Sequence, residues 1–295
     1  MNGAKGEESA GSDIPSAPRA ARRVLDTTAR VNAVLGGAGG ADRVRTGFPS
    51  LDNLLGGGLR RGDVSVLGGD VGVGKSALAL AIALRAAAAG HAAAFLSGEM
   101  TAGRTVERVL ALQGRVRVDD LRRGALDDGT HAAVAAAGLA LRDRAPVLDE
   151  LPDAGVSGVS DFLVEHLGLE LVVIDPLQYL VVGGRSLDDE LAAVSRALKE
   201  LALRRAVSVL VVSHLGRSVR DRNDPRPTLE DFGGHGTIRQ QADIVLALYR
   251  EELYVPSPHT EGAVELHLLK NRNGPRGFVD LYFHKQWLRF EDLVE

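Results

Sequence analysis

Eight consecutive residues, from Gly69 to Ser76, carry the strongest chemical signal in the sequence. They match the spacing of a phosphate-binding loop, in which two glycines are followed by a lysine and a hydroxyl residue. Glycines allow backbone N–H groups to curl around phosphate oxygens, Lys75 would neutralise phosphate charge, and Ser76 would bind Mg²⁺. We therefore predict a nucleotide phosphate site made of Gly69, Asp70, Val71, Gly72, Val73, Gly74, Lys75 and Ser76.

Two carboxylates follow apolar segments and could complete this chemistry. Asp175 ends an apolar run and would bind Mg²⁺ together with Ser76, although an aspartate there could also cap a helix. Glu99 follows segment 92–96, which we expect near the first strand, and would orient the attacking water. Its alternative is a capping role before the next helix. Ligands bind at the carboxyl ends of strands in open α/β sheets, so these side chains should meet there.

His214 follows another apolar segment and could contact the terminal phosphate of a bound nucleotide. A single histidine is more often structural, and the residue pattern alone leaves both roles open.

Strands and helices alternate along most of the chain, which predicts an α/β fold with a central, mostly parallel sheet flanked by helices. Several strand segments are solid apolar runs, as expected for strands buried on both faces. Residues 263–290 are rich in strand signals with turn residues, which predicts C-terminal hairpin strands. The expected strands are 64–68, 92–96, 146–149, 171–174, 207–212 and 244–249, and the expected helices are 75–89, 103–113, 129–143 and 187–205.

Composition excludes several classes of protein. The 295 residues include no cysteine, so disulfides, thiol catalysis and cysteine-bound metals are excluded. No apolar run is long enough to span a membrane, and the N-terminus lacks the apolar centre of a secretory signal. The net charge of −4 gives no indication of nucleic-acid binding through bulk positive charge. We expect a cytoplasmic protein with no membrane contact.

The N-terminal part differs from the rest in composition. Residues 1–18 are rich in Gly, Ser, Glu and Pro and are expected to be disordered. Residues 19–45 contain a short helical pattern followed by a glycine-rich tether, which is either a frayed tail or a helix that docks on a neighbouring subunit. Residues 46–295 would form the catalytic domain.

Several ordered segments together resemble the C-terminal ATPase domain of DnaB-type replicative helicases, in the RecA-like P-loop superfamily. The matching segments are Thr46–Asp63, Ser97–Thr101, Val173–Gln178, Val212–Arg217, Asp231–Asp243, Leu248–Arg250 and Lys270–Pro275.

The resemblance implies an ATP-hydrolysing, Mg²⁺-dependent motor that acts as a homo-hexameric ring on single-stranded DNA. It implies catalytic roles for Lys75, Glu99, Asp175 and His214, where a histidine resembles phage and mitochondrial relatives. Lys270 and Arg272 would reach the ATP of the next subunit, and Arg250 would line the adenine side. Candidate DNA contacts are Arg217, Arg220, Arg222, Gly234, His235 and Gly236, with Arg226 close by.

Two departures from the family pattern alter these expectations. Only about 45 residues precede the core, which makes the usual primase contact doubtful. The usual Arg-Glu-Ser-Gly stretch of the DNA-facing loop is replaced by Gly233-Gly-His-Gly236, which lacks the charge pair and should bind DNA more weakly. Asp221 and Asp224 interrupt the nearby arginines, so DNA contact and a solvated loop are equally open there.

Two further functions remain as alternatives. One is a regulatory or recombination ATPase of the RecA, RadA or KaiC kind, which does not unwind DNA processively. The other is a nucleotide-gated scaffold in which hydrolysis is slow or lost. A cysteine-free chain with one ATPase unit argues against RadA and KaiC, and the combination of Lys75, Glu99 and Asp175 argues against the scaffold.

Overall fold

A nine-stranded sheet forms the centre of the molecule in the computed structural model, which describes residues 42–216, 219–234 and 236–293. The strand order is β11-β10-β9-β8-β3-β7-β6-β4-β5, and the six strands from β3 to β8 are mutually parallel. The parallel strands are β3 (Val64–Gly69), β4 (Ala93–Ser97), β5 (Val147–Glu150), β6 (Leu171–Asp175), β7 (Ser208–His214) and β8 (Ile244–Tyr249); β9 (Ala263–Asn271), β10 (Gly277–His284) and β11 (Arg289–Asp292) continue the sheet antiparallel.

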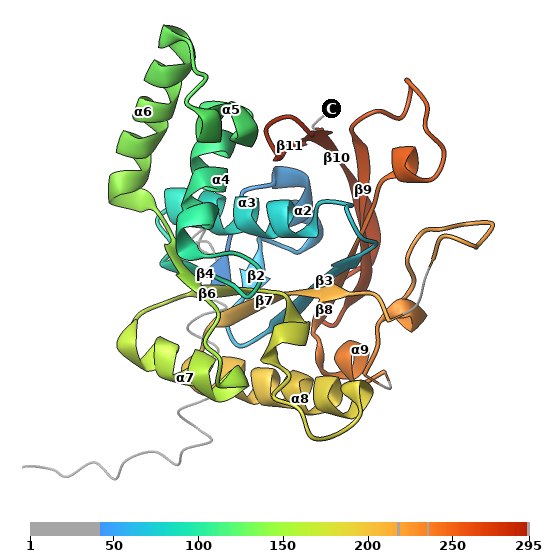
Figure 1. Cartoon of the computed structure of the whole chain (residues 1–295). Coiled ribbons are helices and arrows are strands. Elements are labelled where there is room, and N and C mark those ends of the chain that lie inside the picture. The colour runs from blue at the N-terminus through green and yellow to red at the C-terminus, as the bar shows by residue number, and fades with distance from the viewer. Residues whose placement is uncertain (1–41, 217–218, 235, 294–295) are drawn as a thin grey trace, which may run out of the picture. The chain divides into compact units, whose positions relative to one another are not determined.

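Helices cover both faces of the parallel part of the sheet (Figure 1). The two layers follow from the sequence, because β3, β6 and β8 are almost wholly apolar and bury side chains on both faces. One face carries α2 (Pro49–Leu54), α3 (Lys75–Ala88), α4 (Ala102–Gly114), α5 (Val118–Arg123) and α6 (Asp128–Arg144), and the other carries α7 (Gly155–Glu165), α8 (Leu187–Arg205) and α9 (Thr237–Gln241).

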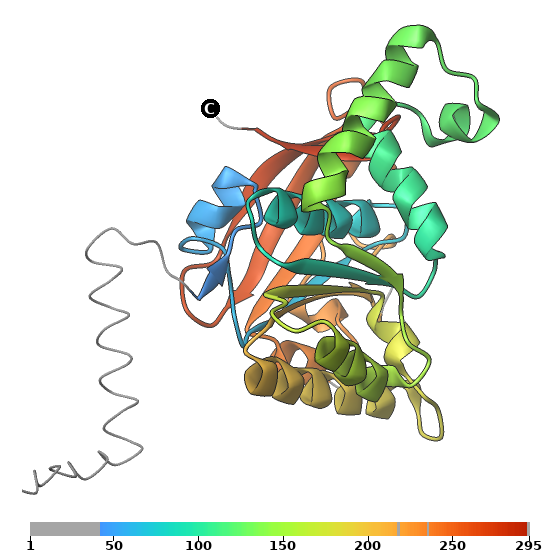
Figure 2. The ribbon, with the colours of Figure 1, turned by 90° about the vertical axis from the view of Figure 1, so that its left-hand side faces the viewer.

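Each layer has its own hydrophobic core. Leu78 and Ile82 of α3 pack with Phe95 of β4 and with side chains of β9 to β11 on one face. Leu198 of α8 packs with Ile174 and Val209 on the other face. The edge-on view in Figure 2 shows the sheet between these two helical layers. The five buried parallel strands, β3, β4, β6, β7 and β8, give a rigid support for the loops at their ends.

Two short strands form a separate antiparallel ribbon. In it, β1 (Arg43–Val44) pairs with β2 (Leu59–Arg60), and Val44 is fully buried. The folded core therefore includes Arg43 and Val44, which the sequence analysis assigned to the tether. A two-residue strand is too short to produce a periodic pattern.

The fold predicted from the sequence is confirmed, with differences in detail. Every strand and helix expected between residues 64 and 249 is present, with boundaries that differ by at most two residues. Segment 92–96 was expected near the first strand; β4 lies in the same sheet as β3, with β7 and β6 between them. Helix α7 was not predicted, since its sequence begins Gly-Val-Ser-Gly-Val and these residues have low helix propensity.

Two further expectations concern the N-terminal segment and membrane-spanning helices. The helical pattern of segment 19–35 lies outside the described residues. Within the described ranges, no helix has the length and apolar character that crossing a bilayer requires.

Candidate active site

Four parallel strands end side by side and carry the predicted catalytic residues at their carboxyl ends. Gly69 ends β3, His214 ends β7, Asp175 ends β6, and Glu99 follows β4 by two residues. The loop that carries Glu99 is fixed to the neighbouring strand, because the Gly98 amide donates to the Asp175 carbonyl oxygen at 2.8 Å. The topology of the sheet therefore brings together residues that are up to 145 positions apart in the sequence.

The phosphate-binding loop joins β3 to α3 and is held by its own lysine. Lys75 is 8% exposed, and its Nζ donates to the carbonyl oxygens of Gly69 and Asp70, both at 3.0 Å. Burial lowers the pKa of Lys75, and the charges of Asp175, Asp70 and Glu99 oppose this shift. A cation that lies over the loop in this way is placed to meet phosphate oxygens.

Gly74 makes the turn into α3 possible. Its φ of 107° lies in the left-handed region, and a Cβ there would come within 2.9 Å of Phe290. No side chain caps the start of α3. The first amides of this 14-residue helix, together with the positive end of its dipole, are the groups that bind anions at helix N-termini.

Asp175 and Ser76 fit a magnesium site. Asp175 is 2% exposed, and its Oδ2 has no hydrogen-bond partner among the described residues. Burial raises the pKa of Asp175 to about 6, which its hydrogen bond with Ser76 partly offsets. A buried carboxylate oxygen beside a hydroxyl suits a hard cation that prefers oxygen ligands. The described residues contain no cluster of three or more metal-ligating His, Asp or Glu side chains, so phosphate and water would supply the other ligands.

Glu99 and His214 face each other across the site. Glu99 Oε1 lies 3.8 Å from His214 Nε2, and both side chains are about half exposed. Burial and the charge of Lys75 lower the pKa of His214, whereas Glu99 raises it. The two side chains thus remain open to solvent above the buried pair of Lys75 and Asp175, where an incoming phosphate and a water molecule could contact them.

Gln178 positions His214, a role that sequence reasoning missed. The His214 amide donates to Gln178 Oε1 at 3.3 Å, and Gln178 Nε2 donates to Ser213 Oγ at 3.4 Å. Gln178 closes the segment Val173–Gln178, and its place three residues after Asp175 was the available signal.

Arg250 contacts the backbone of the phosphate-binding loop. It is 5% exposed, and its NH1 lies 3.2 Å from the Gly72 carbonyl oxygen and 3.4 Å from that of Val73. Its guanidinium also pairs with Glu252 and lies 4.8 Å from the centre of the Phe283 ring. The structure thus places Arg250 against the loop backbone, and its expected place beside adenine stays a prediction.

Lys270 and Arg272 lie at the other end of the strands. Lys270 pairs with Val245 near the start of β8, whereas the phosphate-binding loop leaves the sheet opposite Leu248. The two points are separated by about 10 Å along the strand. Lys270 Nζ donates to carbonyl oxygens of Arg239 and Ala242, both at 2.6 Å, so it contacts the end of α9 and not its own nucleotide loop.

The candidate DNA-contacting arginines are engaged within the chain instead of forming one basic cluster. Arg220 pairs with Asp70 at 2.8 Å, Arg222 pairs with the buried Asp231, and Arg226 forms two hydrogen bonds to Glu265, at 2.8 and 2.6 Å. Arg217 and His235 lie outside the described residues.

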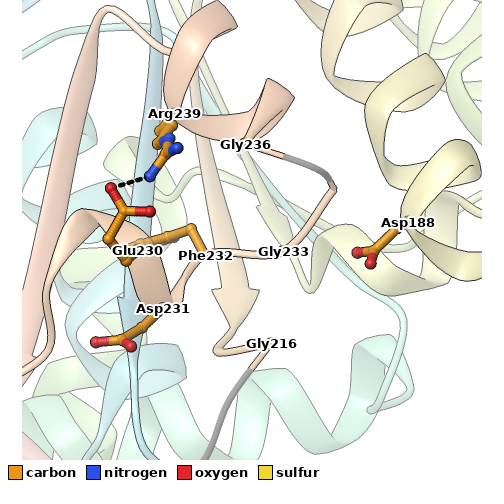
Figure 3. A pocket seen from close by; sticks show the side chains of 8 residues that line it. All are labelled: Asp188, Gly216, Glu230, Asp231, Phe232, Gly233, Gly236 and Arg239. Atoms are coloured by element: carbon orange, nitrogen blue, oxygen red, sulfur yellow. Dashed lines mark ion pairs between the residues drawn. The ribbon is translucent and has the colours of Figure 1, made fainter.

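The glycine-rich loop at Gly233–Gly236 is closed by an acid. The Gly234 amide donates to Asp188 Oδ1 at 2.6 Å. Figure 3 shows Asp188, from α8, facing this loop across a pocket of about 230 Å³ that Glu230, Asp231 and Arg239 also line. Glu230 and Arg239 form an ion pair in this pocket. The amide of Gly234, a candidate DNA contact, is thus already bound to a carboxylate.

Comparisons with known proteins agree with this arrangement. The family model of the DnaB-like helicase C terminal domain matches residues 43–292. The replicative DNA helicase DnaB of Geobacillus stearothermophilus is 35% identical over 257 residues, which cover 85% of this chain and 56% of that protein. The replicative DNA helicase DnaC of Bacillus subtilis (strain 168) is 34% identical with the same coverage. The chain thus spans about half the length of the curated relatives it matches.

Solved structures show the same fold. The ATPase domain of G40P superposes with a TM-score of 0.85 at 25% identity, covering 94% of this chain and 100% of that chain. A DnaB-like replicative helicase, whose structure was described with its primase interactions, gives a TM-score of 0.83 at 25% identity, with coverage of 92% and 66%. Sequence and structure therefore agree that the chain belongs to the DnaB-like helicase C-terminal domain family.

Proposed function

We propose that this chain is the Mg²⁺-dependent, ATP-hydrolysing motor of a DnaB-type helicase, which moves along single-stranded DNA as a ring of six identical subunits. One observation carries the proposal. The chain holds Lys75, Asp175 and Glu99 at one end of its parallel strands, and two cations suited to a phosphate at the other end. A ring of identical subunits joins these two ends, because each interface can combine one subunit's phosphate loop with its neighbour's cations.

Each residue has a specific task in this proposal. Lys75 and the amides at the start of α3 bind the β and γ phosphates. Ser76 and Asp175 would hold Mg²⁺, which neutralises phosphate charge when it is bound. Glu99 orients the attacking water, and His214 contacts the γ-phosphate. Lys270 and Arg272 of the neighbouring subunit stabilise the negative charge that develops as the bond to the γ-phosphate breaks.

The remaining parts of the proposal rest on the family. The curated relatives are named as replicative helicases, and the docking helix expected in residues 19–45 stays a prediction because residues 19–41 lie outside the described residues. DNA contacts come from the arginines around 217–226 and from the Gly233–Gly236 loop, with weaker affinity than a loop that carries an arginine. A structural neighbour is described together with its interactions with primase. We place the protein in the cytoplasm, where DNA replication would occur.

Steady-state ATPase activity with Mg²⁺, measured across protein concentration with and without single-stranded DNA, tests the proposal. Activity per subunit should rise with protein concentration, because a catalytic interface needs two subunits, and should rise again with DNA. Activity that is independent of DNA would leave an ATPase but contradict the translocating motor.

Arg272→Ala tests the part played by the neighbouring subunit. The variant should lower turnover by on the order of a hundredfold or more, as loss of a trans-acting arginine does, while nucleotide affinity stays within about twofold. Equilibrium titration with a fluorescent ATP analogue measures the affinity. Loss of nucleotide binding by the isolated subunit would contradict a role in trans.

A further inference from the structure

A buried carboxylate at the amino ends of the parallel strands connects three segments of the chain. Asp243 is 1% exposed and precedes β8 by one residue. Its Oδ2 accepts hydrogen bonds from Lys199 Nζ of α8 at 2.6 Å and from the Val64 amide at 2.9 Å, and its Oδ1 lies 3.0 Å from Arg272 NH1. One side chain thus contacts a helix, the start of β3 and the residue after β9.

The backbone reinforces this junction. The Asp243 amide donates to the Val64 carbonyl oxygen at 2.8 Å, and the Arg272 amide donates to the Asp243 carbonyl oxygen at 2.9 Å. Val64 is the first residue of β3, and the phosphate-binding loop begins at the last residue of the same strand. Asp243 therefore links the start of β3, the strand that leads into the chain's own phosphate-binding loop, to Arg272, the cation proposed to contact the neighbour's nucleotide.

Arg272 is only partly engaged in this junction. Besides NH1, its NH2 donates to the Gln240 carbonyl oxygen at 3.1 Å, and its side chain remains 49% exposed. A guanidinium has five N–H donors in a fixed planar arrangement, so two contacts can fix its plane while other donors face solvent. Lys199, in contrast, is 15% exposed and serves to neutralise and fix the carboxylate.

We propose that Asp243 is the positioning residue of Arg272. It holds the guanidinium at the angle from which its free donors reach the nucleotide of the neighbouring subunit, and Lys199 fixes Asp243 in turn. This inference rests on the proposed role of Arg272 in trans. It adds that the orientation of Arg272 is set by the base of β3, so the orientation follows the position of the chain's own phosphate-binding strand.

Asp63 provides a matched control in the same cluster. Its Oδ1 lies 3.5 Å from Lys199 Nζ, and its Oδ2 accepts a hydrogen bond from Asn273 Nδ2 at 3.3 Å. Neither of these two contacts involves Arg272. Asp63→Asn therefore makes the same change of charge beside the same lysine without touching the proposed contact. Its turnover should stay within about twofold of wild type, as expected for a change outside the reacting groups.

Asp243→Asn keeps the shape of the side chain and removes the charge that holds Arg272. Turnover should fall on the order of tenfold because the guanidinium is misplaced, while the KM for ATP should change by less than about twofold. A merely structural role would also disturb β3, and with it the chain's own phosphate loop, so nucleotide affinity would fall as well.

Mixed assemblies separate these two roles. Lys75→Ala subunits lack nucleotide turnover but keep intact cations for a neighbour, whereas Asp243→Asn subunits keep an intact phosphate loop. Mixing them should restore ATPase activity well above the sum of the separate activities, because the Asp243→Asn loop then meets a correctly positioned Arg272. Absence of recovery in this mixture would overturn the positioning role.

Mixing Lys75→Ala with Arg272→Ala distinguishes this failure from failure of the proposed function. Recovery there, without recovery with Asp243→Asn, would leave the action in trans intact and overturn only the inference. Absence of recovery in both mixtures would overturn both.

A second variant covers the case in which Asp243→Asn does not fold. Lys199→Met leaves Asp243 and Arg272 in place but removes the cation that fixes the carboxylate. We expect a loss of turnover of about threefold to fivefold, with unchanged KM and recovery in the mixture with Lys75→Ala. An unchanged turnover, or a loss without recovery in the mixture, would overturn the inference.

Discussion

The chain carries two glycine-rich loops, one predicted to bind nucleotide phosphates and the other a candidate DNA contact, and they differ in the charges around them. In the loop Gly69–Ser76, carbonyl oxygens accept hydrogen bonds from Lys75 and Arg250, and the loop leads into the 14-residue helix α3. In the loop Gly233–Gly236, an amide donates to Asp188, and the helix that follows has only five residues.

Glycine content alone is therefore not sufficient to make a phosphate-binding site. In the first loop, cations bind the carbonyl oxygens and carry positive charge to the place of the phosphate. In the second loop, Asp188 accepts a hydrogen bond from the Gly234 amide, whereas the other two acids of the pocket, Glu230 and Asp231, are paired with arginines. Since opposite charges attract and like charges repel, Lys75 favours an anion at the first loop, and Asp188 opposes an anion at the Gly234 amide of the second.

The largest loss of activity is expected when the first loop loses its cation. Lys75→Ala should reduce ATP turnover by at least about a hundredfold, because the loop loses the charge that neutralises the β and γ phosphates. Steady-state phosphate release measures the effect, and thermal denaturation of the variant confirms that it is folded. Turnover at the wild-type rate in a folded variant would show that this loop does not bind the reacting phosphates.

A second prediction uses the acid beside the first loop. Burial raises the pKa of Asp175 from 3.8 to about 6. Because the folded-state pKa lies above the unfolded value, the stabilisation is full below the unfolded pKa and is lost as pH rises through about 6. Asp175→Asn carries no charge, so without nucleotide and Mg²⁺ its free energy of unfolding relative to wild type should increase by on the order of 1 kcal/mol between about pH 5 and pH 8.

Urea denaturation across this pH range measures the difference. The exposed Asp161 of α7 gives the control, because Asp161→Asn makes the same substitution at the surface. A difference between Asp175→Asn and wild type that stays constant with pH would show that burial does not dominate the titration of Asp175.

The smallest effect is expected on DNA affinity, when the acid bound to the second loop is removed. Asp188→Ala frees the Gly234 amide and removes one acid from the pocket, so affinity for single-stranded DNA should increase by roughly threefold to fivefold at low salt. Fluorescence anisotropy of a labelled oligonucleotide measures the affinity. Asp161→Ala changes the net charge equally but far from this loop, and should increase affinity less than half as much. Equal effects of both variants would indicate that bulk charge, and not the loop, controls DNA affinity.

The comparison of the two loops also shows how far the sequence could be interpreted. The strands were predictable because buried parallel strands are solid apolar runs, and the main helices because their apolar residues recur with helical spacing. Asp175 and His214 could be placed at strand ends for the same reason. Helix α7 was missed because its glycines weaken the helical signal, and the order of the strands in the sheet was not predicted because local patterns do not specify which strands pair.

The phosphate-binding loop, the type and order of the main elements, and the family could be predicted from the sequence alone. Each of them depends on residues that are close together in the chain. Only the tertiary structure decided which charges face each other. The Val64 amide and Asp243 are 179 positions apart, Arg250 and Gly72 are 178 apart, and Gly234 and Asp188 are 46 apart. Such pairs form because the sheet and its two helical layers bring distant segments within hydrogen-bond distance, and a buried charge is tolerated only where it meets a partner there.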